Sequence, residues 1–242
     1  MVIATPTQLA ESVLLDVVDR VASDVVVTDV ASVKGNLKNA LEQRYGDVPS
    51  NVVLGHPIAG SEKSGVDAAN PDLYCHHNVI LIDEAGSSGA ARTVDVAMLA
   101  QVRALWESVG AKVFTLSASE HDAVLAHTSH LPHLLAFALV DQLATSADAE
   151  NMFRFAAGGF RDFTRIAGSD PVMWQEIFAA NREQLLLSLQ GFERATEALR
   201  SVIEAGDAAQ LQAQLEKTRQ VRDAFSRQLA ARRAGQEKGW EA

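Results

Sequence analysis

The order of apolar and polar residues divides the chain near residue 117. In the first part, short β-branched runs alternate with helical periodicity, in which apolar residues recur every three or four positions. The expected strands are VIA, VVVTD, NVVLG, NVILID and KVFTLS, and the expected helices cover about 6–22, the stretch after Ser32 and about 94–109. Such alternation is typical of β-α-β units, so it predicts a parallel sheet.

The second part has a different pattern. From Ser119 onward the strand signals disappear and the helical spacing is almost continuous, interrupted clearly only by GSDP at 168–171 and AGD at 205–207. We therefore predict an α/β domain over residues 1–117, followed by an all-α domain over residues 118–242.

Two amphipathic helices are predicted at the end of the chain. Gly206 suits a helix C-terminus and Asp207 can cap the next helix, so the two helices should form an antiparallel hairpin. Their apolar stripes consist of Leu185, Leu189, Phe192, Leu199 and Ile203 on the first helix, and of Leu211, Leu215, Phe225 and Leu229 on the second. Two interpretations are equally supported: the hairpin packs on its own domain, or it joins two subunits in a homodimer.

Composition narrows the class of protein. The 242 residues are 48% hydrophobic, enough to bury a core, and carry a formal net charge of −10. Nucleic acids and anionic membranes attract basic surfaces, so neither is expected as a partner. We expect no membrane span, because no apolar stretch comes close to the roughly 20 residues required, and the start lacks the basic region of a signal peptide. The single cysteine, Cys75, fits a reducing compartment, so we expect a cytoplasmic protein.

One loop stands out chemically, GHPIAGSEKSG at 55–65, which follows the apolar run NVVL. Loops after the strands of parallel sheets hold the chemistry of many α/β proteins. By itself, His56 is equally compatible with a structural histidine and with a general base, because imidazole titrates near neutrality. Ser32, in DVASVKG, lies at a strand-to-helix junction, where serine is most often a helix N-cap. The alternative is a functional hydroxyl at the carboxyl end of the sheet.

Four of the seven histidines lie within thirteen residues, namely His121, His127, His130 and His133. A zinc site is one interpretation. However, steps of three residues drift around a helix by about 60° each, Pro132 interrupts the run, and no carboxylate or cysteine has ligand spacing. We therefore predict no metal, and we expect one or two of these histidines to be buried or to face a substrate.

Two arginines four residues apart, Arg161 and Arg165, lie among aromatic residues in GGFRDFTRIAGSDPVMW. The simpler interpretation is a helix with a solvated charged face. Alternatively, an arginine among apolar residues binds a carboxylate or a phosphate, because its guanidinium can bond two oxygens at once.

A nucleotide-binding turn is missing from this sequence. No Gly-x-Gly-x-x-Gly occurs, although such a turn normally holds the pyrophosphate of a dinucleotide at a helix N-terminus. The chain also begins inside a predicted strand, MVIATP. We therefore expect either a fragment of a longer protein or a different α/β fold.

Four motifs in order carry a family resemblance: DVASVKG, HPIAGSEKSG, SHLPHLLAFAL and GGFRDFTRIAGSDPVMW. They resemble the prephenate dehydrogenase family, the prephenate and arogenate dehydrogenases of tyrosine biosynthesis. The resemblance implies the C-terminal half of a Rossmann-like nucleotide-binding domain, followed by a helical dimerisation domain. It also implies NAD- or NADP-dependent oxidative decarboxylation of prephenate to 4-hydroxyphenylpyruvate, or of arogenate. Because the pyrophosphate turn would lie in the absent half, cofactor binding by these residues alone is expected to fail.

The resemblance assigns roles to individual residues. His56 matches the catalytic histidine, and Ser32 matches the serine that orients the substrate hydroxyl near the nicotinamide. Thr5 and Pro6 match the turn that flanks the nicotinamide. The substrate-binding residues that the resemblance implies are Arg165 on a carboxylate, His133 and Trp174 in the same pocket, and Glu62, Arg161 and Asp162 in an ionic ring at its mouth.

Two alternatives remain at this point. The motifs would also fit a catalytically inactive helical dimerisation module, or another hydroxyacid dehydrogenase with a helical second domain, although the latter is not expected to pair HPIAG with SHLPH. The sequence does not separate prephenate from arogenate, or NAD from NADP, because the residue that reads the ribose belongs to the absent half.

Overall fold

The computed structural model of the chain describes residues 1–60, 67, 69–86 and 94–237, with side chains up to residue 230. It divides into two compact units, Met1–Ser188 and Leu189–Ala242. The first unit contains the sheet and most of the helices. The second contains the end of one long helix and all of the last helix.

The strands form two three-stranded sets. The chain passes directly from the last strand of the first set into the first strand of the second set. The first set is parallel, in the order β1-β2-β3, and comprises β1 (Val2–Ile3), β2 (Val27–Asp29) and β3 (Val52–Val53). The second, in the order β4-β5-β6, comprises β4 (Gly55–Ile58), β5 (Asn78–Ile82) and β6 (Lys112–Leu116). β5 and β6 are parallel, whereas β4 and β5 are antiparallel. The predicted parallel sheet is therefore confirmed, with one antiparallel pair added.

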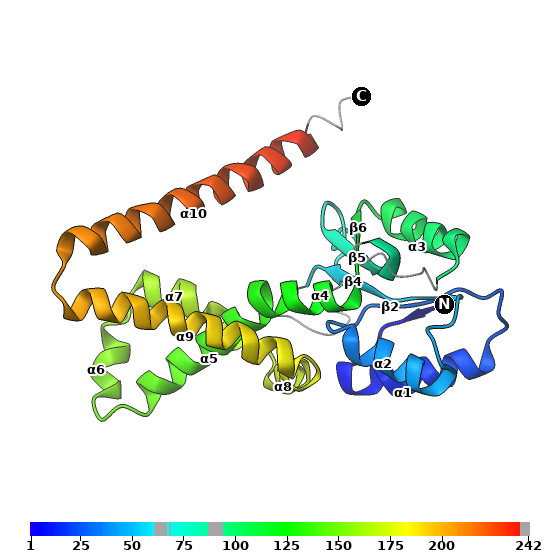
Figure 1. Cartoon of the computed structure of the whole chain (residues 1–242), viewed down its shortest axis with the longest axis horizontal. Helices are drawn as coiled ribbons and strands as arrows, with labels where there is room; N and C mark the ends of the chain where they lie inside the picture. Colours follow the sequence, from blue (N-terminus) through cyan, green and yellow to red (C-terminus); the bar gives the residue numbers. More distant parts are fainter. Residues whose placement is uncertain (61–66, 68, 87–93, 238–242) are drawn as a thin grey trace. The chain divides into compact units, whose positions relative to one another are not determined.

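Helices cover both faces of this sheet (Figure 1). They are α1 (Thr7–Arg20), α2 (Gly35–Tyr45) and α3 (Val96–Ser108). Val52 and Leu54 pack with α1 and α2, whereas Val53, between them, packs with α3. Successive side chains of a strand point to opposite faces, so a strand covered on both sides needs an uninterrupted apolar run. This requirement explains the run NVVL before the histidine loop.

After β6 the described chain is helical. The helices of this part are α4 (Ala118–Leu125), α5 (Leu131–Ala144), α6 (Ala149–Arg154), α7 (Gly158–Thr164), α8 (Pro171–Ala180), α9 (Arg182–Glu204) and α10 (Ala208–Glu237). Before β6, a short 3-10 turn, η2 (Glu84–Gly86), precedes α3. A π-helical turn, η3 (Ala126–His130), joins α4 to α5, and a 3-10 turn, η4 (Arg165–Gly168), follows α7. The predicted change from α/β to all-α structure is confirmed.

The helical stretch Ala118–Ala144 corrects one expectation from the sequence. It is 27 residues long and contains an 18-residue window with a mean hydropathy of 1.4, so by length and composition it could cross a membrane. Length and composition are weak evidence for a span, because core helices of water-soluble proteins also meet this criterion. This stretch carries four histidines and Asp122, which a lipid environment would disfavour.

The turn between α9 and α10 has the predicted chemistry but not the predicted packing. Gly206 has a φ of 65°, a left-handed conformation that favours glycine, and Asp207 Oδ1 accepts a hydrogen bond from Gln210 N at 2.9 Å. However, the apolar stripe of α10 is not buried against α9, since Leu215 and Phe225 are each 54% exposed. The hairpin packing of the two helices within one chain is therefore wrong.

Candidate active site

Three segments with predicted roles meet at one edge of the sheet. Thr5 and Pro6 follow β1, Ser32 follows β2, and His56 lies in β4, directly after β3. Because β1, β2 and β3 are parallel, their carboxyl ends share this edge, where α/β proteins bind ligands. The structure therefore brings together the residues predicted to flank the nicotinamide and the predicted base.

A buried ion pair fixes the Ser32 loop beside His56. Lys34 Nζ bonds Asp29 Oδ2, and both side chains are almost fully buried. The pair also grips the residue before His56, because Lys34 Nζ donates to Gly55 O at 2.7 Å and Asp29 Oδ1 accepts from Gly55 N at 3.1 Å. Burial lowers the pKa of Lys34, and the charge of Asp29 partly offsets this effect. In the sequence, Ser32 lies between Asp29 and Lys34, so the ion pair closes the loop that contains it.

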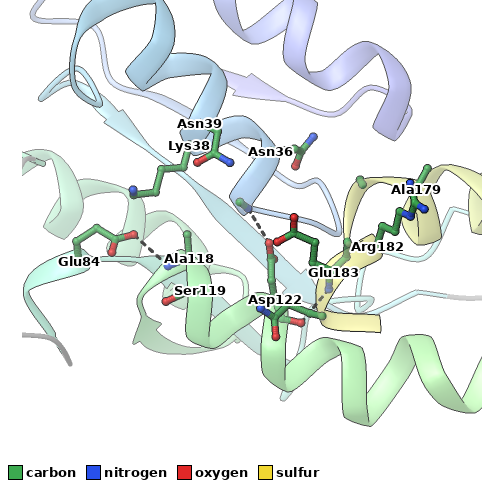
Figure 2. A pocket seen from close by; sticks show the side chains of 14 residues that line it. Asn36, Lys38, Asn39, Glu84, Ala118, Ser119, Asp122, Ala179, Arg182 and Glu183 are labelled. Carbon is green, nitrogen blue, oxygen red and sulfur yellow. Dashed lines mark hydrogen bonds between the residues drawn. The ribbon is translucent and has the colours of Figure 1, made fainter. Parts of the chain in front are cut away.

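Ser32 is not a helix N-cap, contrary to the more common role of such a serine. Helix α2 begins at Gly35, its N-cap position is Lys34, and no side chain at that position caps the helix. Asp122 of α4 replaces the cap: its Oδ1 accepts from Lys34 N at 3.0 Å and its Oδ2 from Gly35 N at 2.7 Å. Figure 2 shows Asp122 reaching the first turn of α2. A Cβ at Gly35 would lie 2.7 Å from Asp122 Oδ2, so this close approach requires glycine.

His56 belongs to a hydrogen-bonded chain of three side chains. Its Nδ1 lies 2.8 Å from His121 Nε2, and His121 Nδ1 lies 2.7 Å from Asp122 Oδ1. A carboxylate only accepts, so His121 Nδ1 carries the proton; neutral His121 then accepts at Nε2 from His56 Nδ1–H. This arrangement leaves a lone pair on His56 Nε2, the nitrogen for which the described residues provide no hydrogen bond.

Both imidazoles of this chain favour the neutral form. Burial, followed by the charges of His121, Lys34 and His130, holds the pKa of His56 well below its usual range. Burial also lowers the pKa of His121, although Asp122 opposes this effect through its hydrogen bond and charge. Neutral His56 and His121 agree with the hydrogen bonds from His56 Nδ1 to His121 Nε2 and from His121 Nδ1 to Asp122.

The π-helical turn changes which histidines point inward. His121 and His130 are buried, whereas His127 is exposed. Asn181 Nδ2 donates to Asp122 O at 2.8 Å and lies 3.1 Å from His130 Nδ1, so His130 accepts at that nitrogen. Burial lowers the pKa of His130 to about 4. A regular α-helix would place these histidines on different faces from those observed, because a π turn has one more residue per hydrogen-bonded turn than an α-helix.

A second cluster contains three residues predicted to bind substrate. The rings of His133 and Trp174 stack, with centroids 3.6 Å apart and planes inclined by 20°. His133 Nδ1 donates to Ser129 O at 2.9 Å, which leaves Nε2 as an acceptor. Burial lowers the pKa of His133, the bond to Ser129 opposes this, and the positive charge of Arg165 lowers it further. The structure thus brings His133, Trp174 and Arg165 together.

Helix α8 positions Trp174 against the Ser32 loop. Its start lies at the predicted break GSDP, where Asp170 Oδ1 accepts from Val172 N at 2.8 Å and Pro171 is the first helical residue. Trp174 and Ile177 form a buried cluster with Val33, the neighbour of Ser32. Trp174 Nε1 is buried without a hydrogen-bond partner among the described residues. A buried donor of this kind is suited to a polar ligand atom.

The predicted ionic ring stays a prediction. Arg161 Nε lies 3.0 Å from Asp162 Oδ1, and the two side chains are 79% and 73% exposed. The third member, Glu62, lies outside the described residues.

A cavity of about 530 Å³ borders Asp122 (Figure 2). It is lined by Gly35, Asn36, Lys38 and Asn39 of α2, by Glu84, by Ala118, Ser119 and Asp122 of α4, and by residues 179–184. None of the predicted site residues that the structure describes lines this cavity. We therefore place the candidate active site at His56 and not in the cavity.

Five residues of the site were missed or given no role from the sequence: Asp29, Lys34, His121, Asp122 and Asn181. One signal was available for Lys34, because a lysine in the apolar segment ASVKG needs a buried partner. Each of the others also bonds a residue from a distant part of the chain, which spacing does not reveal: Asp29 bonds Gly55, His121 bonds His56, Asp122 bonds Gly35 and Asn181 bonds Asp122.

The residues near β1 fit a nicotinamide in one respect. Thr5 Oγ1, in the turn between β1 and α1, is buried and lacks a hydrogen-bond partner among the described residues. A buried hydroxyl in this condition can bond a ligand amide. Thr5, Pro6 and Ser32 are therefore the residues that could contact the nicotinamide part of a dinucleotide.

Comparison with known proteins gives consistent matches. The family model described as "Prephenate dehydrogenase, nucleotide-binding domain" matches residues 1–115, and "Prephenate dehydrogenase, dimerization domain" matches residues 117–217. The chain is 35% identical over 187 residues to the cyclohexadienyl dehydrogenase of Zymomonas mobilis, covering 76% of this chain and 60% of that protein. It is 35% identical over 218 residues to the prephenate dehydrogenase of Bacillus subtilis, covering 87% of this chain and 55% of that protein.

A solved structure is also similar. The prephenate dehydrogenase of Aquifex aeolicus, in complex with hydroxyphenyl propionate and NAD+, is 36% identical with a TM-score of 0.83 and covers 93% of this chain and 75% of that one. The chain thus spans 55–60% of the length of the two curated relatives.

Proposed function

Because the chain belongs to the prephenate dehydrogenase family, we propose that it supplies the base and the substrate-binding residues for an NAD(P)-dependent oxidative decarboxylation. The substrate would be prephenate, converted to 4-hydroxyphenylpyruvate, or arogenate. The observation that carries this proposal is the chain from Asp122 through His121 to His56, which leaves an unprotonated Nε2 at the carboxyl edge of the sheet.

His56 is the proposed base. As the ring carbon that bears the hydroxyl is oxidised, the hydroxyl proton passes to His56 Nε2. Loss of carbon dioxide sends the bonding electrons through the ring to the new carbonyl oxygen, which takes the proton back and becomes a phenol. The driving force is aromatisation of the substrate, so the protein mainly positions groups and holds one proton. Ser32 is proposed to orient the same hydroxyl.

Arg165 is proposed to bind a substrate carboxylate, because its charge acts on His133 and so lies close to the His133–Trp174 stack. His133 and Trp174 are proposed to line the pocket around the ring. Trp174 Nε1 and His133 Nε2 would offer one donor and one acceptor to polar atoms of the substrate. Arg161, Asp162 and Glu62 are proposed to form the charged mouth of this pocket.

Thr5, Pro6 and Ser32 are proposed to flank the nicotinamide. When bound, NAD or NADP would accept the hydride that leaves the ring carbon. The orphaned Thr5 hydroxyl supports this placement, since it needs a polar partner that the described chain does not provide.

We also propose a homodimer, a domain boundary near residue 117 and a cytoplasmic location. The boundary is supported by the two family models, which meet between residues 115 and 117. The dimer is supported by the family description "dimerization domain" and by the exposed apolar residues of the C-terminal helices, including Ile203, Leu215 and Phe225. The cytoplasmic location is supported by the single cysteine and the acidic composition.

An activity assay tests the proposal against the alternative of an inactive helical module. These residues, fused to the part of a curated relative that the chain does not cover, should form reduced cofactor and carbon dioxide from prephenate or arogenate. A folded protein that binds NAD or NADP but turns over neither substrate would favour the inactive module. Prephenate and arogenate, and NAD and NADP, are compared by kcat/KM in the same assay.

A further inference from the structure

The two helices that begin at the active edge share an unusual feature, because each is capped by a carboxylate from the helical part of the chain. Neither Pro6 nor Lys34, at the N-cap positions of α1 and α2, supplies a side-chain cap. Asp122 of α4 caps α2, as described above. Glu176 of α8 caps α1, since its Oε2 accepts from Gln8 N at 3.1 Å. The partners of this second bond are 168 residues apart in the sequence.

Glu176 is buried, and its environment explains why a carboxylate is tolerated there. Only 8% of the residue is exposed. A buried carboxylate is costly without partners, but the unpaired amides and the positive dipole end of a helix N-terminus stabilise it. Its position at the first turn of α1 places it next to the Thr5–Pro6 turn.

Helix α8 therefore contacts the site at three points. Trp174 stacks on His133, Ile177 packs on Val33 beside Ser32, and Glu176 bonds the start of α1. Because α8 is only ten residues long, a shift at one of these contacts moves the others.

We propose that Glu176 is a positioning residue that fixes Trp174 relative to the Thr5–Pro6 turn, and so sets the spacing between the substrate pocket and the nicotinamide. The contact itself is independent of activity; only the identity of the two ligands rests on the proposed function. Glu176 acts through its bond to Gln8 and through Trp174 on the same helix.

Two NMR signals of the 242-residue chain test this proposal without substrate or cofactor: hydrogen exchange of the Gln8 amide and the indole N–H resonance of Trp174. In Glu176→Ala, Gln8 exchange should accelerate about tenfold or more, and the Trp174 resonance should shift. Glu176→Gln keeps a neutral acceptor, so it should give a smaller change in both signals, because bonds to charged acceptors are stronger. Should Glu176→Ala fail to fold, Glu176→Gln and Glu176→Asp carry the test.

Gln175→Ala is the matched control, since Gln175 is the exposed neighbour on α8. It should change neither signal. Unchanged Gln8 exchange in the Glu176 variants would show that the cap is not formed. Faster Gln8 exchange with an unmoved Trp174 resonance would overturn the positioning role and leave only a local cap. Both NMR signals are measured without turnover. A protein that lacks the proposed enzyme activity can therefore still support or contradict the role of Glu176.

Discussion

His56 Nδ1 and His121 Nε2 lie 2.8 Å apart, although 65 residues separate them in the sequence. His121 is fully buried and bonded to Asp122, so it cannot rotate away from His56 without losing two hydrogen bonds. The orientation of the proposed base is thus set by a buried residue of α4. Activity is expected from these residues fused to the remaining length of a relative, since the chain spans 55–60% of the two curated relatives.

Replacement of the base should reduce turnover more than binding. His56→Asn keeps much of the shape and a hydrogen bond but removes the proton acceptor, so kcat should fall by roughly 10²- to 10⁴-fold with a smaller change in KM. Steady-state kinetics with prephenate and arogenate provide the measurement. The exposed His127, replaced in His127→Asn, is the control and should retain normal kcat. Near-normal turnover in His56→Asn would contradict the assignment.

Loss of the charge on Asp122 should destabilise the fold. In Asp122→Asn, one carboxylate oxygen becomes an NH2 group, which donates hydrogen bonds and accepts none. The side chain therefore loses at least one of its bonds from the two α2 amides and His121. We expect the free energy of unfolding to fall by about 1–3 kcal/mol. Urea denaturation measures this change, with Asp141→Asn on the exposed face of α5 as the control. Equal stability of the two variants would mean that the Asp122 contacts contribute little.

Acid should destabilise the protein through its buried histidines. The pKa of His130 is about 4 in the folded state, against about 6.5 when unfolded. Between these values the unfolded chain binds a proton that the folded chain excludes, so stability rises with pH through this window and is lost as pH falls. For His130 alone, the loss between about pH 7.5 and pH 5 should be about 2 kcal/mol.

Urea denaturation at the two pH values measures the loss for the native chain and two variants. His130→Gln should reduce the difference, whereas His127→Gln should preserve it because His127 is exposed. The same pH dependence in all three proteins would rule out His130 as its source.

Replacement of the proposed anchor should weaken substrate binding. Arg165→Gln removes a charge-assisted pair with a substrate carboxylate, so KM should rise by on the order of tenfold or more, with a smaller loss in kcat. Arg154→Gln, at an exposed arginine of α6, is the control. If KM for Arg165→Gln equals that of the native protein, Arg165 belongs to a solvated charged face.

The 242-residue chain should self-associate through its C-terminal helices. Phe225 is 54% exposed on α10, and burial of such an aromatic side chain is a common source of interface affinity. Phe225→Asp should therefore raise the dimer dissociation constant by about tenfold or more, as measured by sedimentation equilibrium. Gln220→Asp, at an exposed polar position of the same helix, should have little effect. A monomeric native chain at micromolar concentration would contradict the proposal.

Local chemistry was sufficient to predict the strands and the change from α/β to helical structure. The apolar runs gave the strands because a strand covered on both faces needs consecutive apolar residues, and NVVL is such a strand. Asp170 and Pro171 start α8, and Gly206 and Asp207 form the turn before α10, because caps depend on residues within one turn of each other. His56 was identified as a candidate from its loop and from the family motif.

The tertiary structure alone decided how that candidate is oriented. Ser32 was expected to cap α2 in its simpler interpretation, yet Asp122, 87 residues beyond Gly35, provides the cap. In the same way, Glu176 caps α1, and Lys34 is buried on Asp29 and Gly55. A helix N-terminus accepts a carboxylate from any part of the chain that packs against it, so the sequence determines that a cap is needed but not which residue provides it. Packing also decided that α10 leaves its apolar stripe exposed in the single chain, because amphipathic periodicity identifies a face to be buried without identifying its partner.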